Sequence, residues 1–143
     1  MPQVCVDASF SLKLVLPEPE RPAVLAQWDS WEGNGFDFIA PSLWLYETHS
    51  TLRRKAVSGV LTEDEAVQAW RILLAHGVET AIPAGLLDRA WMLAAELGLH
   101  RTYDMTYLAL AELRGCELWT ADNRTVNAAR GRFEWLHSVD ELP

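Results

Sequence analysis

The pattern of hydrophobic and polar positions predicts strands and helices that alternate along the chain. Short apolar runs with β-forming residues predict strands at 4–6, 36–40, 78–82, 117–120 and 133–136. Between these runs, apolar residues recur at helical spacing. They predict helices at 9–16, 22–33, 42–57, 62–76, 85–97, 103–113 and 122–129.

Several helix ends carry their own sequence signals. Thr62 with Glu65 three residues later has the form of a capping box, and Ser42 is a candidate N-cap for the helix that follows it. Gly77 and Gly115 lie just after two of the predicted helices, where glycine commonly ends a helix. These signals fix helix boundaries that periodicity alone leaves open.

Strands separated by helices predict parallel pairing through βαβ crossovers. We therefore expect an α/β fold, a three-layer α/β/α sandwich with a mainly parallel sheet of four or five strands. The chain has no internal repeat, low-complexity segment or linker, so residues 1–143 are expected to form a single domain. In open sheets of this kind, ligands bind beyond the carboxyl ends of the strands.

The composition is that of an ordinary globular protein, with 143 residues, 50% hydrophobic and 22% charged. No apolar run approaches the roughly 20 residues that span a bilayer, and the first residues lack the basic region of a signal peptide. We therefore expect a cytoplasmic protein with no membrane partner. Cys5 and Cys116 lie in or beside predicted strands and are interpreted as buried free thiols rather than a disulfide or metal site.

The net charge of −8 argues against a general nucleic-acid binder, because such proteins usually carry a basic surface. Two local features weaken that objection. Bound divalent cations would change the charge that a substrate meets at a cluster of acids. Basic residues also gather locally, at 53–55 and at Arg124, Arg130 and Arg132.

Two acids lie at predicted strand ends. Asp7 directly follows the first strand, and Asp122 follows strand 117–120 after one residue. Each can also be explained as a helix N-cap, since aspartate is a preferred residue there.

Two further acids lie on predicted helices. Asp104 shares a helix face with the apolar residues Tyr107 and Leu108, and a carboxylate on such a face is costly unless it is paired or binds a cation. Glu47 lies in the middle of a helix with a mixed face, where a solvated side chain is the alternative.

Together, Asp7, Glu47, Asp104 and Asp122 predict a carboxylate cluster at one end of the sheet. Like charges held close together repel one another, and hard divalent cations remove that cost. Oxygen ligands favour Mg²⁺ or Mn²⁺, whereas a zinc site would normally include His or Cys. Carboxylate-held metal suits phosphodiester hydrolysis by an activated water.

Four segments, in this order, resemble the PIN-domain nucleases and, among them, the VapC-type toxins of toxin–antitoxin pairs. These segments are Val4–Ser9, Pro41–Glu47, Tyr103–Ala111 and Leu118–Asn123. The Tyr-Asp pair followed by Thr-Ala-Asp is the most specific part. The resemblance covers essentially the whole chain.

This resemblance implies a PIN-like fold and a Mg²⁺- or Mn²⁺-dependent endoribonuclease that cleaves single-stranded or looped RNA. Asp7, Asp104 and Asp122 would bind metal, and Glu47 would bind metal or orient water. Ser9, Thr120 and Asn123 would support the site by hydrogen bonds. A homodimer and a small cognate antitoxin that blocks the acidic groove are also implied.

Two other functions stay open on the sequence. The first is a non-catalytic module of the same fold that binds RNA or protein, and the second is a nuclease that acts outside a toxin pair. Among the tryptophans, Trp28, Trp31 and Trp44 are candidates for a partner surface.

Overall fold

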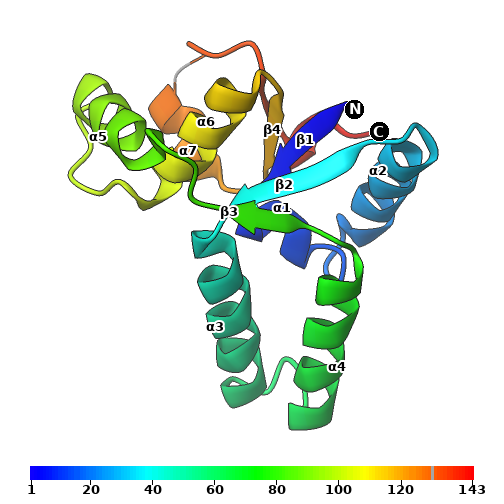
Figure 1. Cartoon of the computed structure of the whole chain (residues 1–143). Helices are drawn as coiled ribbons and strands as arrows, with labels where there is room; N and C mark the ends of the chain where they lie inside the picture. Colours follow the sequence, from blue (N-terminus) through cyan, green and yellow to red (C-terminus); the bar gives the residue numbers. More distant parts are fainter. Residues whose placement is uncertain (130) are drawn as a thin grey trace.

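A computed structural model describes residues 1–129 and 131–143, so Arg130 lies outside the described residues. Its sheet has five strands, all paired in parallel, in the order β3-β2-β1-β4-β5 (Figure 1). The strands are β1 Gln3–Val6, β2 Asp37–Pro41, β3 Glu79–Ala81, β4 Glu117–Thr120 and β5 Leu136–Ser138.

Helices flank the sheet and complete the predicted three-layer α/β/α fold, which is confirmed. They are α1 Ala8–Leu12, α2 Arg21–Gly33, α3 Leu43–Val57, α4 Glu63–Ala75, α5 Leu86–Glu96, α6 Tyr103–Arg114 and α7 Asn123–Ala129, with a short 3₁₀ helix at Val139–Glu141. Helix α6 packs against β1, β2 and β4, and α5 packs on α6. Figure 1 shows α3 and α4 extending together away from the sheet.

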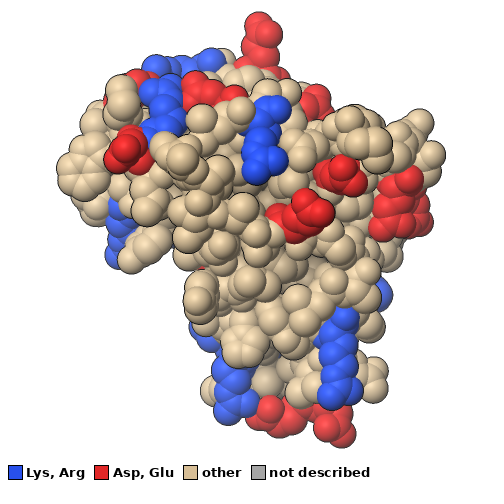
Figure 2. Space-filling model, in the orientation of Figure 1, with Lys and Arg blue, Asp and Glu red and all other residues tan. Residues whose placement is uncertain are grey.

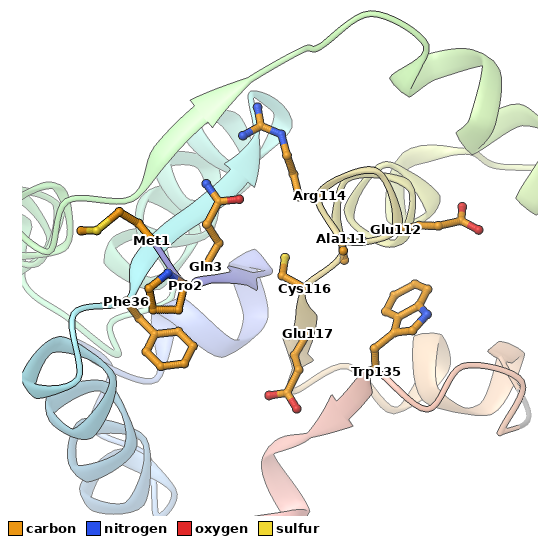
Figure 3. A pocket seen from close by; sticks show the side chains of 11 residues that line it. Met1, Pro2, Gln3, Phe36, Ala111, Glu112, Arg114, Cys116, Glu117 and Trp135 are labelled. Carbon is orange, nitrogen blue, oxygen red and sulfur yellow. The ribbon is translucent and has the colours of Figure 1, made fainter.

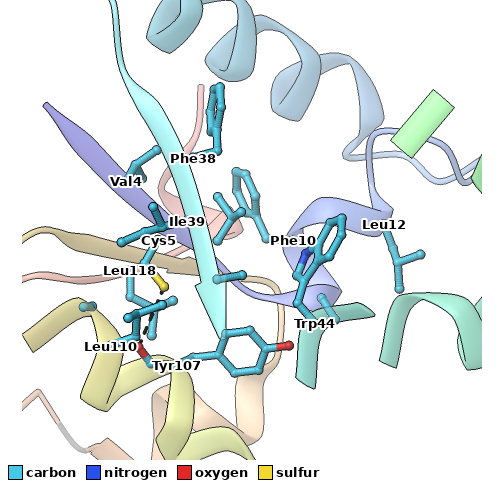
Figure 4. Close-up of a cluster of buried hydrophobic side chains, with 14 of the residues drawn as sticks. Val4, Cys5, Phe10, Leu12, Phe38, Ile39, Trp44, Tyr107, Leu110 and Leu118 are labelled. Atoms are coloured by element: carbon cyan, nitrogen blue, oxygen red, sulfur yellow. Dashed lines mark hydrogen bonds between the residues drawn. The ribbon is translucent and has the colours of Figure 1, made fainter. Parts of the chain in front are cut away.

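The core is built around β1, whose residues Val4, Cys5 and Val6 are buried. Figure 4 shows this cluster, with aromatic side chains from α1 and α3 and apolar side chains from α6. Cys5 and the half-buried Cys116 are both free thiols.

The tryptophans expected at a partner surface are in the core instead. Trp28, Trp31 and Trp44 are all buried, and Trp28 stacks on Phe38 with ring centroids 4.0 Å apart. That prediction was wrong. Large aromatic side chains stabilise the core by burying much apolar surface, and helical periodicity alone does not show that they are buried. The strongly exposed tryptophan is Trp91 on α5.

Most predicted elements are confirmed with ends shifted by about one residue, and two elements shift further. Helix 9–16 ends as α1 at Leu12, and the chain continues as a turn before Pro17. The last strand lies at Leu136–Ser138 rather than 133–136, because a turn closed by the Leu136 N–H on the Phe133 carbonyl precedes it. Pro41 is the last residue of β2 rather than the residue that follows it.

The two predicted N-caps have different outcomes. Thr62 and Glu65 form the capping box, with reciprocal hydrogen bonds of 3.1 and 2.9 Å. Ser42 makes no capping hydrogen bond, because its backbone is already helical. In the described part of the chain, no helix is both long and apolar enough to span a bilayer.

The strand order places the topological switch between β1 and β4. From β1 the chain builds outward through β2 and β3, and it then returns to add β4 and β5 on the other side of β1. The carboxyl ends of β1 and β4 are therefore where a ligand site is expected.

Candidate active site

Asp7 lies buried at the carboxyl end of β1 and caps α1. Its Oδ1 accepts hydrogen bonds from the Phe10 N–H and the Ser9 hydroxyl, both at 2.8 Å, and its Oδ2 accepts one from the Thr120 hydroxyl. Burial raises the pKa of Asp7 to about 7, against these hydrogen bonds, which lower it. Asp7 therefore is the N-cap of α1, as one interpretation of the sequence expected. Its buried position nevertheless makes the charged form of its carboxyl group unfavourable.

Ser9 and Thr120 connect the ends of β1 and β4. The Ser9 hydroxyl accepts the N–H of Ala121 at 3.0 Å, and the Thr120 hydroxyl accepts the N–H of Asp122 at 2.9 Å. Both hydroxyls also donate to Asp7. This network fixes the backbone that carries Asp122 against the carboxyl group of Asp7.

Asp122 is paired with a cation of its own chain. The Arg124 guanidinium donates to both carboxylate oxygens, at 3.2 and 3.1 Å, and the Arg124 backbone N–H donates to Oδ1 at 2.9 Å. Asp122 thus also caps the start of α7. The neighbouring Asn123 is exposed, and its side chain makes no hydrogen bond to another described residue, so its supporting role stays a prediction.

Asp104 lies in the first turn of α6 and is half-buried, at the edge of the apolar face rather than within it. Its carboxylate has no hydrogen bond or ion pair with any residue in the ranges 1–129 and 131–143. Burial raises its pKa, and the charge of Asp122 raises it further, whereas Arg124 and Arg101 lower it. Asp104 is the acid most available to a ligand.

Glu47 is held by a tyrosine from another helix. The Tyr107 hydroxyl on α6 donates to Glu47 Oε1 at 2.5 Å. Burial raises the pKa of Glu47, and the charges of Asp104 and Asp122 raise it as well, although the tyrosine hydrogen bond lowers it. Burial and Glu47 together raise the pKa of Tyr107, so its phenol stays protonated and continues to donate.

The position of α3 explains how Glu47 reaches this site. The buried Trp44 Nε1 donates to the Ser11 hydroxyl at 2.9 Å, and Ser11 donates to the Asp7 carbonyl at 2.8 Å. These bonds attach the start of α3 to α1, one helical turn before Glu47. Glu47 is half-buried and bonded to Tyr107, so its side chain is only partly solvated.

Three of the four acids line a common pocket. Glu47, Asp104 and Asp122 contribute to a hollow of about 340 Å³ between α1 and α3, and Asp7 lies buried behind it. Their charges act on one another, since Asp122 raises the pKa values of Asp7, Glu47 and Asp104. The structure therefore brings all four predicted acids to the carboxyl ends of β1 and β4.

The donors fit a hard divalent cation in type and charge, because all are carboxylate oxygens whose repulsion a cation would relieve. Their positions do not form a ready coordination group. Within the described residues, no three or more His, Cys, Asp or Glu side chains are placed to hold a metal ion together. Metal binding would need the carboxylates to move closer, and Arg124 would compete with the cation for Asp122.

A larger hollow lies at the other end of the strands. It measures about 680 Å³ and lies at the amino ends of β1 and β4, where Gln3, Cys116 and Trp135 are among the lining residues (Figure 3). None of the four acids lines it. This hollow lies at the amino ends of the strands and lacks the four acids, so it is separate from the candidate active site.

Tyr107 and Arg124 are the site residues that sequence reasoning missed. A buried tyrosine normally needs a hydrogen-bond partner, and Tyr107 lies one turn after Asp104 on the same helix. That spacing was a usable signal for Tyr107. The sequence shows Arg124 only as part of a basic group, because its pairing with Asp122 depends on the turn that starts α7.

Known proteins resemble this chain in sequence and in fold. Residues 4–131 match the PIN domain family. The chain is 34% identical over 125 residues to VapC ribonuclease Mb0985 of Mycobacterium bovis, covering 85% of this chain and 87% of that protein. It matches Ribonuclease VapC9 of Mycobacterium tuberculosis with the same identity and the same coverage.

Solved structures show the same fold at lower identity. PAE2754 from Pyrobaculum aerophilum has a TM-score of 0.68 at 24% identity, covering 97% of this chain and 85% of that chain. VapC20 of Mycobacterium tuberculosis has a TM-score of 0.66 at 22% identity, covering 87% and 94%. VapBC2 from Rickettsia felis has a TM-score of 0.70 at 13% identity, covering 95% and 96%.

Proposed function

Because this chain belongs to the PIN domain family, with VapC ribonucleases among its relatives, we propose that it is a metal-dependent endoribonuclease. Residues 1–143 would form one nuclease domain that acts in the cytoplasm as the toxin of a toxin–antitoxin pair. The observation that carries this proposal is the convergence of Glu47, Asp104 and Asp122 on one pocket, with Asp7 behind them.

In the proposed reaction, Asp7, Asp104 and Asp122 would hold Mg²⁺ or Mn²⁺, and Glu47 would bind metal or orient the attacking water. A bound divalent ion lowers the pKa of a coordinated water and offsets charge on the phosphodiester. Tyr107 keeps Glu47 in one orientation through its 2.5 Å hydrogen bond. Ser9 and Thr120 fix Asp7 in the same way.

Single-stranded or looped RNA is the proposed substrate. Such RNA exposes unpaired bases that a protein pocket can read. VapC20, one of the structural neighbours, is described as a toxin that cleaves the sarcin–ricin loop, which supports looped RNA as a substrate class here.

Cleavage assays with Asp104→Asn test this function. The wild-type protein should cleave RNA in Mg²⁺ or Mn²⁺ and lose that activity in excess EDTA. The Asp104→Asn variant should cleave at least about 100-fold more slowly, since it removes a charge from the reacting site. Asp64→Asn, which changes an exposed acid on α4, is the matched control and should cleave normally. Full activity of Asp104→Asn, or cleavage in EDTA, would contradict the proposal.

We also propose a cognate antitoxin and a homodimer as partners. The VapBC2 structure from Rickettsia felis is described as a complex of both components on promoter DNA, which supports an antitoxin for this chain. Co-expression with a small neighbouring reading frame should relieve growth inhibition and yield a stable complex. Light scattering of the purified chain measures its oligomeric state directly.

A non-catalytic binding module of the same fold is the second candidate. The observation in its favour is the pairing of Asp122 with Arg124, which leaves the carboxylates without a formed ligand group among the described residues. Titration with Mn²⁺ separates the two candidates. A protein that binds no Mn²⁺ at millimolar concentration and cuts no RNA would be the binding module.

A further inference from the structure

Two hollows share lining residues at the carboxylates, and together they are called the groove. The first, described above, lies between α1 and α3, and the second, of about 240 Å³, lies between the start of α6 and α7. Glu47, Asp104 and Arg124 line both of them. The acids therefore lie at the middle of the groove, with one arm on each side.

The arm along α3 ends in two cations. Glu47, Thr51, Arg54 and Lys55 recur at helical spacing and line the same hollow. Arg54 lies roughly 10 Å beyond Glu47, from the helical rise of 1.5 Å per residue. Within the described part of the chain, neither Arg54 nor Lys55 pairs with a carboxylate, and Arg54 contacts Thr51 at 2.9 Å.

The adjacent Arg53 behaves differently from these two. It pairs with Glu63 of α4 at 2.7 Å and does not line the groove. The basic run at 53–55 is thus divided by the helix into one cation that pairs with α4 and two cations that line the same hollow as the acids.

The other arm carries a cation and an exposed aromatic ring. Arg101 and Tyr103 both line it, and the Tyr103 side chain is 61% exposed. Arg101 has no carboxylate partner within the described residues, although its charge acts on Asp104 and lowers the pKa of that acid. Tyr46, the exposed tyrosine beside Glu47, lines neither hollow.

Charge complementarity identifies the occupant of this groove. The chain carries a net charge of −8, yet cations without carboxylate partners flank its most acidic site on both sides. Phosphate groups would use these cations, since a polyanion crossing the acids needs compensation on either side. An exposed tyrosine beside an arginine offers a stacking surface for an unpaired base, which a duplex does not present.

We propose that a single RNA strand crosses the acids along this groove, with phosphates on Arg54 and Lys55 and an unpaired base stacked on Tyr103 beside Arg101. This inference rests on the proposed ribonuclease function and assigns substrate-positioning residues to it. It gives the strand two different contacts, an electrostatic one along α3 and a stacking one at the start of α6.

Binding measured without cleavage tests the inference. Fluorescence anisotropy with a labelled single-stranded RNA of about 12 nucleotides, in EDTA, reports Kd at several salt concentrations. The Arg54→Ala/Lys55→Ala double variant should weaken binding and reduce the slope of log Kd against log salt by about 1.4, or about 0.7 for each phosphate contact with a single strand. Tyr103→Ala should weaken binding about 5- to 150-fold with an unchanged slope, because stacking is not electrostatic.

Matched variants make the result specific. Arg53→Ala and Tyr46→Ala remove the same side-chain types from outside the groove and should bind within about twofold of wild type. A duplex of the same sequence should bind more weakly than the single strand and be insensitive to Tyr103→Ala.

The outcomes also separate this inference from the nuclease proposal. Wild-type binding by both groove variants, or equal losses in the controls, would overturn the inference even if the protein cleaves RNA. Lack of RNA binding at low salt, with capture of an acidic protein segment instead, would overturn it as well. The predicted binding pattern in a protein that never cleaves would support the groove and contradict the nuclease.

Discussion

At the scale of single residues, the carboxyl group of Asp7 is buried although it carries a titratable proton. Three hydrogen-bond donors surround it, yet burial raises its pKa from an ordinary value of 3.8 to about 7. The folded protein therefore binds a proton at Asp7 more tightly than the unfolded chain does. This difference couples stability to pH.

The metal-free protein should lose stability between pH 5 and pH 8. Because the folded pKa of Asp7 is raised, its contribution is complete below about pH 4 and is lost as the pH rises through 7. The free energy of unfolding in EDTA should fall by about 2–3 kcal/mol over this window on account of Asp7.

Urea unfolding of the wild type and Asp7→Asn, at pH 5 and pH 8, checks this expectation. The neutral amide of the variant cannot titrate, so that part of the pH dependence should be missing from it. Subtracting the pH dependence of the unfolding free energy of Asp7→Asn from that of the wild type removes the contributions of the other titrating groups. Parallel pH profiles for the two proteins would show that Asp7 is not the group responsible.

Tyr107 gives a second test at the residue scale. Tyr107→Phe removes the donor to Glu47 Oε1 and leaves the ring packed in place. Loss of a hydrogen bond that orients a carboxylate beside a metal typically costs 10- to 100-fold in metal affinity or activity. We expect a loss of that size in RNA cleavage and in Mn²⁺ affinity, together with a stability loss of about 1–3 kcal/mol from the missing hydrogen bond to a carboxylate.

Steady-state cleavage, Mn²⁺ titration and thermal unfolding of Tyr107→Phe provide the three measurements. Tyr46→Phe is the matched control, because Tyr46 is exposed and adjacent to Glu47 in sequence. Unchanged cleavage and Mn²⁺ affinity in Tyr107→Phe would remove the positioning role assigned to Tyr107.

At the scale of elements, the junction of β1, α1 and α3 determines where Glu47 lies. The buried Ser11 donates to the carbonyl of Asp7 and accepts from Trp44 Nε1. Thr48, also buried, donates to the Trp44 carbonyl at 2.7 Å. This junction connects a strand end to the helix that carries an acid, over a long separation in sequence.

Ser11→Ala should destabilise this junction. It leaves the buried Trp44 N–H without its partner, and an unsatisfied buried donor costs about 1–3 kcal/mol. Urea unfolding should show that loss, and cleavage should also fall as the start of α3 loosens. The exposed Ser58→Ala control should change stability by less than about 0.5 kcal/mol. Equal stability of the two variants would contradict the structural role of Ser11.

The sequence predicts those features of the elements that depend on local physics. Strand 117–120 and the capping box at Thr62 are confirmed because apolar runs and caps are local signals. The boundaries at α1 and β5 differ because Leu14 and Leu16 pack in a turn, and because a turn before Leu136 delays the last strand. Such turns are stabilised by tertiary contacts that a short window does not contain.

The residues of the candidate site also differ in how far the sequence alone could place them. Asp7 and Asp122 could be placed by position alone, since parallel strands end at one edge of the sheet. The environment of Glu47 could not, because its burial depends on Tyr107 from α6 and on the attachment of α3 to α1. The pairing of Asp122 with Arg124 was equally hidden, because it needs the side-chain geometry of a turn.

At the scale of the whole molecule, the net charge and its placement have to be considered together. Figure 2 shows one face on which acidic and basic side chains are scattered among neutral ones, with both signs at the end of the α3–α4 projection. A uniform basic surface is not visible on this face. The excess of negative charge makes affinity for RNA depend on the cations of the groove rather than on the general surface.

Metal binding should therefore appear as stability of the whole fold. A ligand that binds the folded state alone stabilises it by about 2.7 kcal/mol at 100 times its Kd. We expect Mn²⁺ to raise the melting temperature at pH 8 and to do so less at pH 5.5. Asp7, one of the proposed ligands, has a pKa raised to about 7 and must lose its proton for a cation to bind.

Arg124→Ala makes this last prediction specific to the site. Arg124 pairs with both oxygens of Asp122 and is 87% exposed, so its removal should cost the fold little and free one carboxylate for the cation. An exposed ion pair is worth about 0.2–1 kcal/mol, so the Mn²⁺ Kd should fall by up to about fivefold. Asp104→Asn should abolish the thermal shift, and Arg53→Ala should leave it unchanged. A weaker Mn²⁺ affinity in Arg124→Ala would mean that Arg124 supports the metal site instead of competing with the cation for Asp122.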